Sequence, residues 1–474
     1  MVFSSLIFTF IFLPVVVILY FLAKEEYRNY LLLIASLIFY AYGEPRFVFV
    51  MLVSIAVNYA FAVGMDVMQN RGRLVYKRSL LISDIIFNLS LLFVFKYLNY
   101  TVGVINTVFH TQLYFSPIPL PIGISFFTFQ ALSYCIDVYN GKVKVQRNPL
   151  FVALYISFFP QLIAGPIVRY STIEDQIVKR RVTLQGFSDG FRRFLLGFSK
   201  KIILANHLAV ISEEVWAANP DHTNPLMLWI GSISFSLQIF YDFSAYSDMA
   251  IGLGKLFGFS FEENFNYPYL SGSVTEFWRK WHISLGRWFR DYVYIPLGGS
   301  RVSLPRHILN LLIVWLLTGL WHGANITFVV WGFWFFAMLC MEKFLIQPEK
   351  KGTVVSVFWR ITTLLSINFG WVLFNSPGIK RAILYIKGML GLSAGRLSVD
   401  TEIMRMVREY GVFFLLGLFF CVPWGELLQK RLSTNTLAVG VKAILQPVIY
   451  GLLFLWAVSF EILGAHNPFI YYNF

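Results

Sequence analysis

The chain has few charged residues and few cysteines for its length. Asp, Glu, Lys and Arg make up only 14% of its 474 residues, whereas hydrophobic residues make up 57%. This balance excludes a soluble domain of ordinary size. Cys135, Cys340 and Cys421 lie in apolar surroundings at unrelated spacings, so they predict neither a disulfide framework nor a metal site. Long polar linkers are also missing, and we therefore expect a single domain over residues 1–474.

Acidic residues are scarcer than basic ones, and the formal net charge is +14. The basic residues cluster at the ends of hydrophobic segments, which indicates cytoplasmic anchoring of a membrane protein and not nucleic-acid binding. Because Lys24 and Arg28 follow the first apolar run, we expect the N-terminus outside the cytoplasm. The last expected span should bring the C-terminus to the same side. We therefore expect an all-α, polytopic integral membrane protein.

Apolar runs long enough to form membrane helices recur along the chain. The expected spans include residues 6–23, 47–63, 79–97, 119–139, 226–254, 354–374, 411–427 and 440–463. Arg192, Arg193 and Lys200 recur near helical spacing among phenylalanines, which predicts an amphipathic helix at the cytoplasmic interface. Such a helix could anchor to anionic membrane lipid or dock the phosphates of a nucleotide-containing cofactor, and both interpretations stay open.

Charge is absent from Ile308 to Met341, a run of 34 residues that contains His322. As one helix this run would be ~51 Å long, well beyond the ~30 Å hydrocarbon core. A break is therefore expected at or beside His322, where helix-weakening residues gather: Thr318, Gly319, Gly323, Ala324 and Asn325. Irregular backbone at membrane depth must be buried in protein or line a cavity.

His322 is a candidate catalytic residue because a histidine at membrane depth costs free energy unless it faces protein, water or substrate. The alternative is a histidine that is only hydrogen-bonded within a helix bundle. Burial disfavours imidazolium, so we expect a neutral ring able to act as a general base. Asn325 and Trp321 lie beside it in sequence and are candidates for stabilising an oxyanion or orienting a substrate.

The segment from Thr275 to Arg290 contains a second histidine, His282, among cations and tryptophans. As one helix, it would place His282 on a face with Trp278, Leu285 and Phe289. His282 could line a substrate passage or serve as a hydrogen-bonded support. The neighbouring face suits the cytoplasmic interface or the phosphates of an acyl carrier, and its candidate cofactor-binding residues are Arg279, Arg287 and Arg290. We expect Trp278, Trp281 and Trp288 at the lipid boundary.

Two acids, Asp242 and Asp248, occur inside an apolar run, and we expect them to pair with Lys or Arg or to cap a broken helix. A different class of function is also open. In a polysaccharide or lipid transporter, His322 and the two acids would form a proton relay, although the lack of an internal repeat disfavours this interpretation. A structural scaffold for glycan secretion is the third possibility.

Several motifs resemble the membrane-bound O-acyltransferase (MBOAT) family, and the resemblance spans nearly the whole chain. The motifs are residues 1–5, 121–126, 163–166, 241–252, 276–284 and 321–325. Within the family they look most like the bacterial branch that O-acetylates exported polysaccharides such as alginate or peptidoglycan. The aromatic residues 469–474 are similar to the end of that branch as well.

The resemblance implies a ring of transmembrane helices around a thin centre with a through-membrane tunnel. It implies that His322 is the essential histidine and His282 the supporting one, with cytoplasmic acetyl-CoA as acyl donor and no metal. It also implies a bacterial inner-membrane location and an extracytoplasmic SGNH/GDSL-type O-acetyltransferase as partner. Tyr471 is the candidate acyl acceptor, but Tyr472 stands where phenylalanine is more familiar, so the choice of acceptor stays open.

Overall fold

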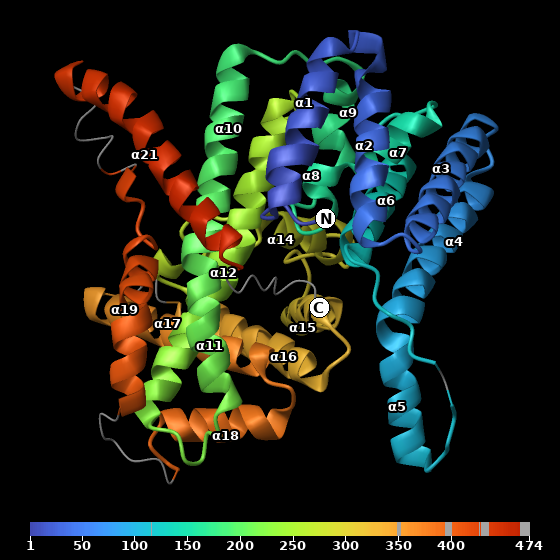
Figure 1. Ribbon diagram of the computed structural model, residues 1–474. Coiled ribbons are helices and arrows are strands. Elements are labelled where there is room, and N and C mark those ends of the chain that lie inside the picture. The colour runs from blue at the N-terminus through green and yellow to red at the C-terminus, as the bar shows by residue number, and fades with distance from the viewer. Residues whose placement is uncertain (115, 348–351, 394–400, 426, 428–435, 465–474) are drawn as a thin grey trace. The chain divides into compact units, whose positions relative to one another are not determined.

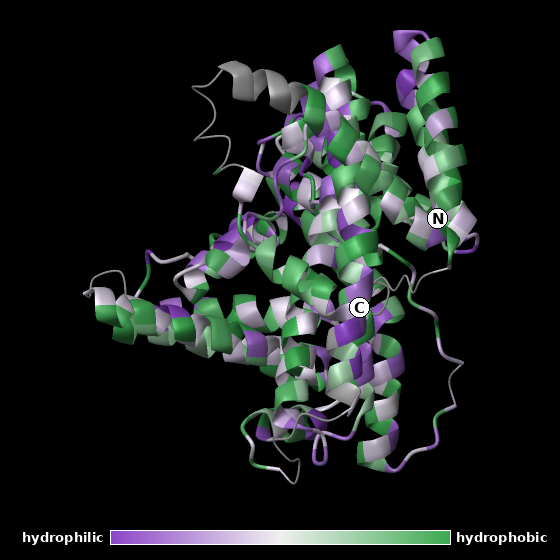
Figure 2. Cartoon of the chain, turned by 60° about the vertical axis from the view of Figure 1, so that its left-hand side comes forward, coloured by the Kyte–Doolittle hydropathy of each residue, from purple (hydrophilic) through white to green (hydrophobic). Residues whose placement is uncertain are grey.

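The protein is described from a computed structural model. It describes residues 1–114, 116–347, 352–393, 401–425, 427 and 436–464. Within these residues all regular secondary structure is helical, which confirms the all-α prediction (Figure 1). Eight helices among them are long and apolar enough to cross a membrane. Hydrophobic residues cover most of the length of the long helices (Figure 2), as expected for a multi-pass membrane protein.

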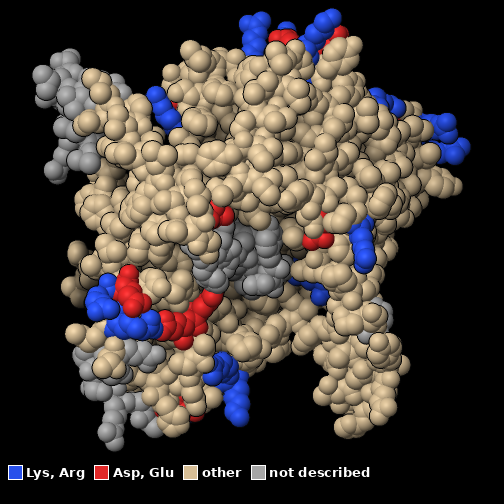
Figure 3. All heavy atoms as spheres, viewed as in Figure 1, with Lys and Arg blue, Asp and Glu red and all other residues tan. Residues whose placement is uncertain are grey.

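The chain folds into two compact units. The first comprises Met1–Phe194, Met249–Glu263 and Arg287–Pro296, and the second comprises Leu195–Asp248, Asn264–Gly286 and Leu297–Phe474. The prediction of a single domain over residues 1–474 stays a prediction. Large areas of the molecular face in Figure 3 carry neither acidic nor basic side chains, as the composition leads us to expect.

The first unit is built from helices α1 to α9 and the start of α10. Their bounds are α1 Leu13–Leu22, α2 Arg28–Gly43, α3 Val48–Asn70, α4 Leu74–Leu92, α5 Leu98–Phe109, α6 Ile124–Tyr139, α7 Pro149–Ser157, α8 Phe159–Leu162, α9 Tyr170–Val178 and α10 Leu184–Ser199. Polar side chains join three of these helices inside the unit. Asn58 of α3 and Asn88 of α4 exchange side-chain hydrogen bonds of 3.3 and 2.9 Å, and Cys135 of α6 lies 3.4 Å from the Asn58 carbonyl oxygen. Cys135 is thus a buried core residue, as expected.

The second unit contains the remaining helices. Their bounds are α11 Asn206–Ala217, α12 Pro225–Leu256, α13 Val274–Lys280, α14 Ile283–Phe289, α15 Leu304–His322, α16 Ile326–Cys340, α17 Thr353–Asn375, α18 Ile379–Met389, α19 Thr401–Phe419 and α21 Thr436–Ile462. The ends of α12 and α14 belong to the first unit. Three π-helical or 3-10 segments also lie here: η4 Lys200–Ala205, η5 Pro268–Leu270 and η7 Met341–Ile346.

The amphipathic helix expected around Arg192 is present as α10, and its place at the cytoplasmic interface stays a prediction. It is not a separate helix, however. Helix α10 continues through η4 into α11 (Figure 1), and the 34 residues Leu184–Ala217 are long and apolar enough to span a membrane. The physical reason is that the lysines of η4 are paired with carboxylates, described below, which lowers the cost of placing them within a span.

The break predicted in the long uncharged run is confirmed. Helix α15 ends at His322, and α16 begins at Ile326. Asn325 caps α16, since its Oδ1 atom accepts a hydrogen bond of 3.1 Å from the Thr327 amide. The two helices approach closely because glycines lie where they meet. A side chain on Gly319 would collide with the carbonyl oxygen of Phe328.

The prediction of a continuous helix over residues 275–290 is wrong. Helix α13 ends at Lys280, α14 starts at Ile283, and His282 lies in the turn between them with φ of 44°. This left-handed conformation is uncommon for a residue with a side chain. The apolar spacing of the segment fits a helix, but hydrogen bonds to a distant asparagine, Asn264, stabilise the turn instead.

Candidate active site

His322 is the last residue of α15 and is only 6% exposed. Three aromatic rings surround its imidazole nearly edge-on, with centroid distances of 5.0 Å to Trp321, 5.1 Å to Trp331 and 5.0 Å to Phe374. These rings come from α15, α16 and α17, so the site depends on the packing of all three helices. Such a dry setting strengthens any hydrogen bond or charge interaction made by the imidazole.

His282 is 3% exposed and lies in the turn between α13 and α14. Its Nδ1 atom is 3.1 Å from Asn264 Oδ1, and its ring meets the ring of Phe243 from α12 at 4.6 Å. Neither α13 nor α14 is among the eight candidate spans. Burial lowers the pKa of His282 from 6.5 to about 3, because water no longer stabilises the imidazolium. The ring is therefore neutral at ordinary pH.

Trp321 connects the two histidines. Its indole centroid lies 5.9 Å from the His282 ring and 5.0 Å from the His322 ring. The second unit thus brings together three predicted site residues from a loop turn and a helix end that are about 40 positions apart. Both polar atoms of the Asn325 side-chain amide bond to groups other than the histidines. Its Nδ2 atom donates to the Pro377 carbonyl at 2.9 Å, and its Oδ1 atom caps α16. Its prediction as an oxyanion donor stays a prediction.

Two of the three tryptophans expected at the lipid boundary lie in the protein interior, and the third, Trp278, is half-buried. Trp281 and Trp288 are buried. The Trp281 ring packs 4.8 Å from Trp371, and in the first unit Trp288 stacks on Phe129 at 3.8 Å. Trp278 meets Trp331 at 5.5 Å. The expectation was wrong because tryptophan suits both a membrane interface and a helix core.

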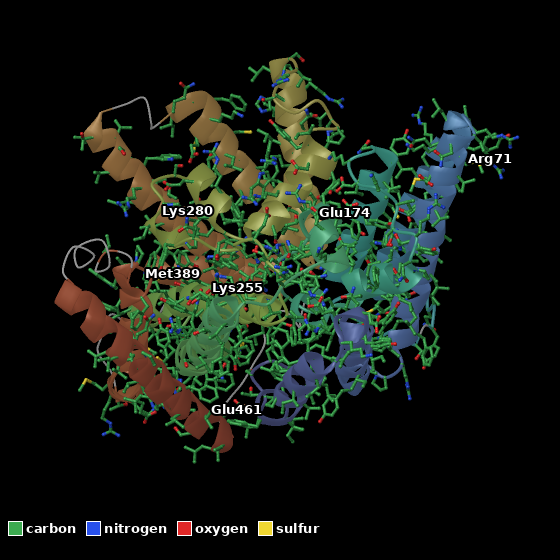
Figure 4. The ribbon with its side chains drawn as sticks, turned by 90° about the horizontal axis from the view of Figure 1, so that it is seen from above. Arg71, Glu174, Lys255, Lys280, Met389 and Glu461 are labelled. Carbon is green, nitrogen blue, oxygen red and sulfur yellow. The ribbon has the colours of Figure 1, made fainter. Side chains whose placement is uncertain are left out.

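Glu342 of η7 holds the start of α13. Its buried carboxylate accepts hydrogen bonds from the Val274 amide at 2.7 Å, the Thr275 amide at 3.1 Å and the Trp359 indole at 3.1 Å. A negative group at this end also matches the helix dipole. Lys280, at the other end of α13 (Figure 4), pairs with Glu276 at 2.6 Å. Glu342 therefore fixes the helix that leads directly into His282.

The two acids of α12 pair with the two lysines of η4, which confirms the predicted pairing. Lys201 Nζ lies 2.7 Å from Asp242 Oδ1, and Lys200 Nζ lies 2.5 Å from Asp248 Oδ2. Because these carboxylates are held by lysines, the structure gives the proton-relay interpretation no support.

The three predicted cofactor-binding arginines lie in different units. Arg279 is an exposed residue of α13 in the second unit. In the first unit, Arg287 pairs with Glu262 at 2.5 Å and Arg290 pairs with Asp291 at 2.7 Å. Two of the three guanidinium groups are thus engaged with carboxylates, and cofactor binding by all three stays a prediction. Among the described residues, no three His, Cys, Asp or Glu side chains gather closely enough to hold a metal ion.

Comparison with known proteins identifies the family. Residues 34–376 match the membrane-bound O-acyltransferase family, MBOAT. The chain belongs to this family. It is therefore an enzyme, an O-acyltransferase, as the motifs indicated.

Three relatives illustrate the range of similarity. The probable alginate O-acetylase AlgI of Pseudomonas aeruginosa is 42% identical over 429 residues, which cover 88% of this chain and 82% of the relative. The peptidoglycan O-acetyltransferase of Helicobacter pylori is 30% identical, with 100% and 98% covered. The teichoic acid D-alanyltransferase of Bacillus subtilis is 28% identical over 273 residues, with 54% and 67% covered.

In this MBOAT protein, sequence reasoning located both histidines and Trp321 but missed two residues that support them. Asn264 contacts His282 from 18 residues earlier in the chain, and Glu342 contacts the start of α13 from more than 60 residues later. A polar Asn264 among aromatic residues and an acid directly after an uncharged run are the only signals in the sequence. Tyr471 lies outside the described residues, so its role as acyl acceptor stays a prediction.

Proposed function

We propose that this MBOAT protein takes an acetyl group from cytoplasmic acetyl-CoA and passes it across the membrane for O-acetylation of an exported polysaccharide. The observation that supports the proposal is that the rings of His322 and His282 both lie beside the indole of Trp321 inside an aromatic core. The names of the alginate and peptidoglycan O-acetylating relatives support the acetyl group and the polysaccharide. A bacterial cytoplasmic membrane, with both termini outside the cytoplasm, fits this direction of transfer.

In the proposed reaction, His322 acts as the general base. Its neutral imidazole removes the proton of the acceptor hydroxyl while the hydroxyl oxygen attacks the thioester carbonyl. The carbonyl oxygen becomes an oxyanion, for which the indole N–H of Trp321 is our proposed donor. The tetrahedral intermediate then collapses, the carbon–sulfur bond breaks, and His322 returns the proton to the thiolate of CoA. The products are free CoA thiol and an acetyl ester.

The acceptor and the donor belong to opposite sides of the membrane. We propose Tyr471 as the first acceptor hydroxyl, from which an extracytoplasmic SGNH/GDSL-type O-acetyltransferase moves the acetyl group to the polysaccharide. Moving only an acetyl group avoids carrying either charged CoA or a polymer through the membrane. The phosphates of CoA suit an arginine such as Arg279, which is exposed.

Release of free CoA thiol from acetyl-CoA by the purified protein, with an acceptor present, tests the proposal. We expect His322→Ala to lower the rate to that of the solution without enzyme. His222→Ala, which changes an exposed histidine of the loop before α12, is the matched control and should retain the wild-type rate. A folded, membrane-inserted His322→Ala protein with an unchanged rate would contradict the proposal, and transport of a polymer without CoA release would favour a transporter.

A further inference from the structure

Asn264 is a buried residue of the second unit, between α12 and η5, and both of its oxygen atoms contact the His282 turn. Its backbone oxygen accepts from the Ile283 amide at 2.9 Å. Its Oδ1 atom is 3.2 Å from the Ser284 amide, 2.9 Å from Ser284 Oγ and 3.1 Å from His282 Nδ1. Its Nδ2 atom donates to Ser247 Oγ of α12 at 3.1 Å. One asparagine therefore ties the turn to helix α12.

The orientation of the Asn264 amide follows from these contacts. A backbone N–H can only donate, so the atom that faces the Ser284 amide must be the oxygen. Rotating the amide by half a turn would place its NH2 group against that N–H, and two donors cannot form a hydrogen bond. The amide oxygen is thus the atom beside His282.

This orientation determines which ring nitrogen of His282 carries the proton. The Asn264 Oδ1 atom cannot donate, so His282 Nδ1 must be protonated to form the contact at 3.1 Å. In a neutral imidazole, the other nitrogen then carries the lone pair. Ser284 Oγ, at 3.5 Å from the same nitrogen, makes a much longer contact than its 2.9 Å contact with Asn264, so it does not compete as the main partner.

We propose that Asn264 is a positioning residue that holds His282 as the Nδ1–H tautomer, so that Nε2 of His282 serves as a hydrogen-bond acceptor for an N–H or O–H group of a bound substrate. The two histidines then have distinct roles. His322 exchanges a proton during acyl transfer, whereas His282 accepts a hydrogen bond and stays neutral. This assignment of roles rests on the proposed function, but the tautomer itself does not.

The backbone of His282 supports a dedicated role for Asn264. A φ of 44° is unfavourable for histidine, and such a conformation persists only when the surrounding structure enforces it. Asn264 supplies that constraint through hydrogen bonds to the two residues after His282. Removing its side chain can therefore disturb folding as well as the tautomer, and the test must separate the two effects.

The tautomer can be measured directly by nitrogen-15 NMR of the full-length protein with labelled histidine, using His282→Gln to assign the signals. We expect a protonated Nδ1 and an unprotonated Nε2 in the wild-type protein. A protonated Nε2 would overturn the proposal, whether or not the protein proves to be an acetyltransferase. This measurement needs no substrate, so its failure is distinguishable from failure of the proposed function.

Two variants then test whether Asn264 is responsible. Asn264→Asp keeps the acceptor oxygen and should keep the Nδ1–H tautomer, whereas Asn264→Leu removes the acceptor and should lose it. In the CoA-release assay we expect Asn264→Leu to lower kcat by about 10- to 100-fold and Asn264→Asp to recover most of that loss. If Asn264→Leu does not fold, the tautomer of the wild-type protein and the CoA-release rate of Asn264→Asp still test the proposal. A folded Asn264→Leu protein that retains the Nδ1–H tautomer, or an Asn264→Asp protein that has lost it, would overturn the role of Asn264.

Discussion

The ammonium group of Lys201 lies 2.7 Å from the carboxylate of Asp242, and the two side chains are only 3% and 1% exposed. The pair joins η4 to α12, the helix that also contacts His282 through Phe243. A buried ion pair adds little over apolar packing of the same shape, but loss of one partner leaves an uncompensated charge.

Removing either partner alone should therefore be far more harmful than removing both. We expect Lys201→Met or Asp242→Leu to destabilise the protein by about 3–5 kcal/mol, and the double variant to recover much of that loss. Thermal unfolding in detergent measures the effect. Lys200→Met is the matched control, because Lys200 and Asp248 are 23% and 22% exposed and water can solvate the remaining charge. If Lys200→Met destabilised the protein as much as Lys201→Met, burial of the Lys201–Asp242 pair would not explain the loss of stability.

Glu342 should control activity through the position of α13. In Glu342→Ala, the buried amide of Val274 loses its acceptor at a cost of about 1–3 kcal/mol, and the half-buried amide of Thr275 loses its acceptor at a smaller cost. We expect a lower kcat for CoA release with little change in KM, because the residue does not contact substrate in the proposed reaction. Glu276→Ala, which removes a half-buried pair with Lys280 and one hydrogen bond from the Gly272 amide, should have a smaller effect. A raised KM with unchanged kcat would indicate a binding role instead.

The close approach of α15 and α16 predicts low tolerance for larger residues. Gly319→Val would push a side chain into the Phe328 carbonyl, so the helices must separate and the rings around His322 must shift. We expect loss of thermal stability together with loss of activity. Gly103→Ala is a suitable control, because a methyl group there meets open space and should favour helix α5 by about 0.5–1 kcal/mol. A fully stable Gly319→Val protein would show that the helices can adjust.

Sequence reasoning predicted the break at His322 because it depends on local facts. A run of 34 uncharged residues is too long for the hydrocarbon core, and small residues mark where the helix can end. The break at His282 was missed because the apolar spacing around it also fits a helix. What decides that turn is Asn264, which is 18 residues earlier in the chain, and no local pattern contains that contact.

Burial of the tryptophans also depends on contacts between residues that are far apart in the sequence. Trp281 is an aromatic residue with cationic neighbours in the sequence, as is typical of a membrane interface. In the structure it packs against Trp371 of α17, which lies about 90 residues later. Pairing of Asp242 and Asp248 was predictable in kind, since acids in an apolar run need cations. Which lysines serve them depends on how η4 lies against α12, and the sequence alone does not determine this.

Arg279 is the predicted cofactor-binding arginine whose side chain is exposed in the second unit. If it contacts the phosphates of acetyl-CoA, Arg279→Gln should raise KM for acetyl-CoA with little change in kcat, because the contact is the same in the ground state and in the transition state. Arg279→Lys should recover part of the loss, since a point charge still attracts phosphate. Arg287→Gln, which removes a pair with Glu262, tests whether the first-unit arginines matter. An unchanged KM for Arg279→Gln would contradict its assignment.

The neutral, buried state of His282 predicts a specific dependence of stability on pH. Its pKa is about 3 in the folded protein, compared with the ordinary value of 6.5. Between these two values, the unfolded chain binds a proton at this residue and the folded protein does not, so the residue lowers stability as the pH falls. Above pH 6.5 the effect is absent. At pH 5 it amounts to about 2 kcal/mol, since one pKa unit corresponds to about 1.4 kcal/mol.

His282→Gln removes this titration and keeps a polar side chain of similar length. For each protein, the free energy of unfolding at pH 5 is compared with its value at pH 7. We expect the decrease for His282→Gln to be about 2 kcal/mol smaller than the decrease for the wild-type protein. His222→Gln is the matched control and should behave as the wild-type protein does, because His222 is exposed and lies outside the packed interior. The same fall for wild type and His282→Gln would mean that the folded protein accommodates a charged His282. In that case a neutral acceptor role for this residue could not hold.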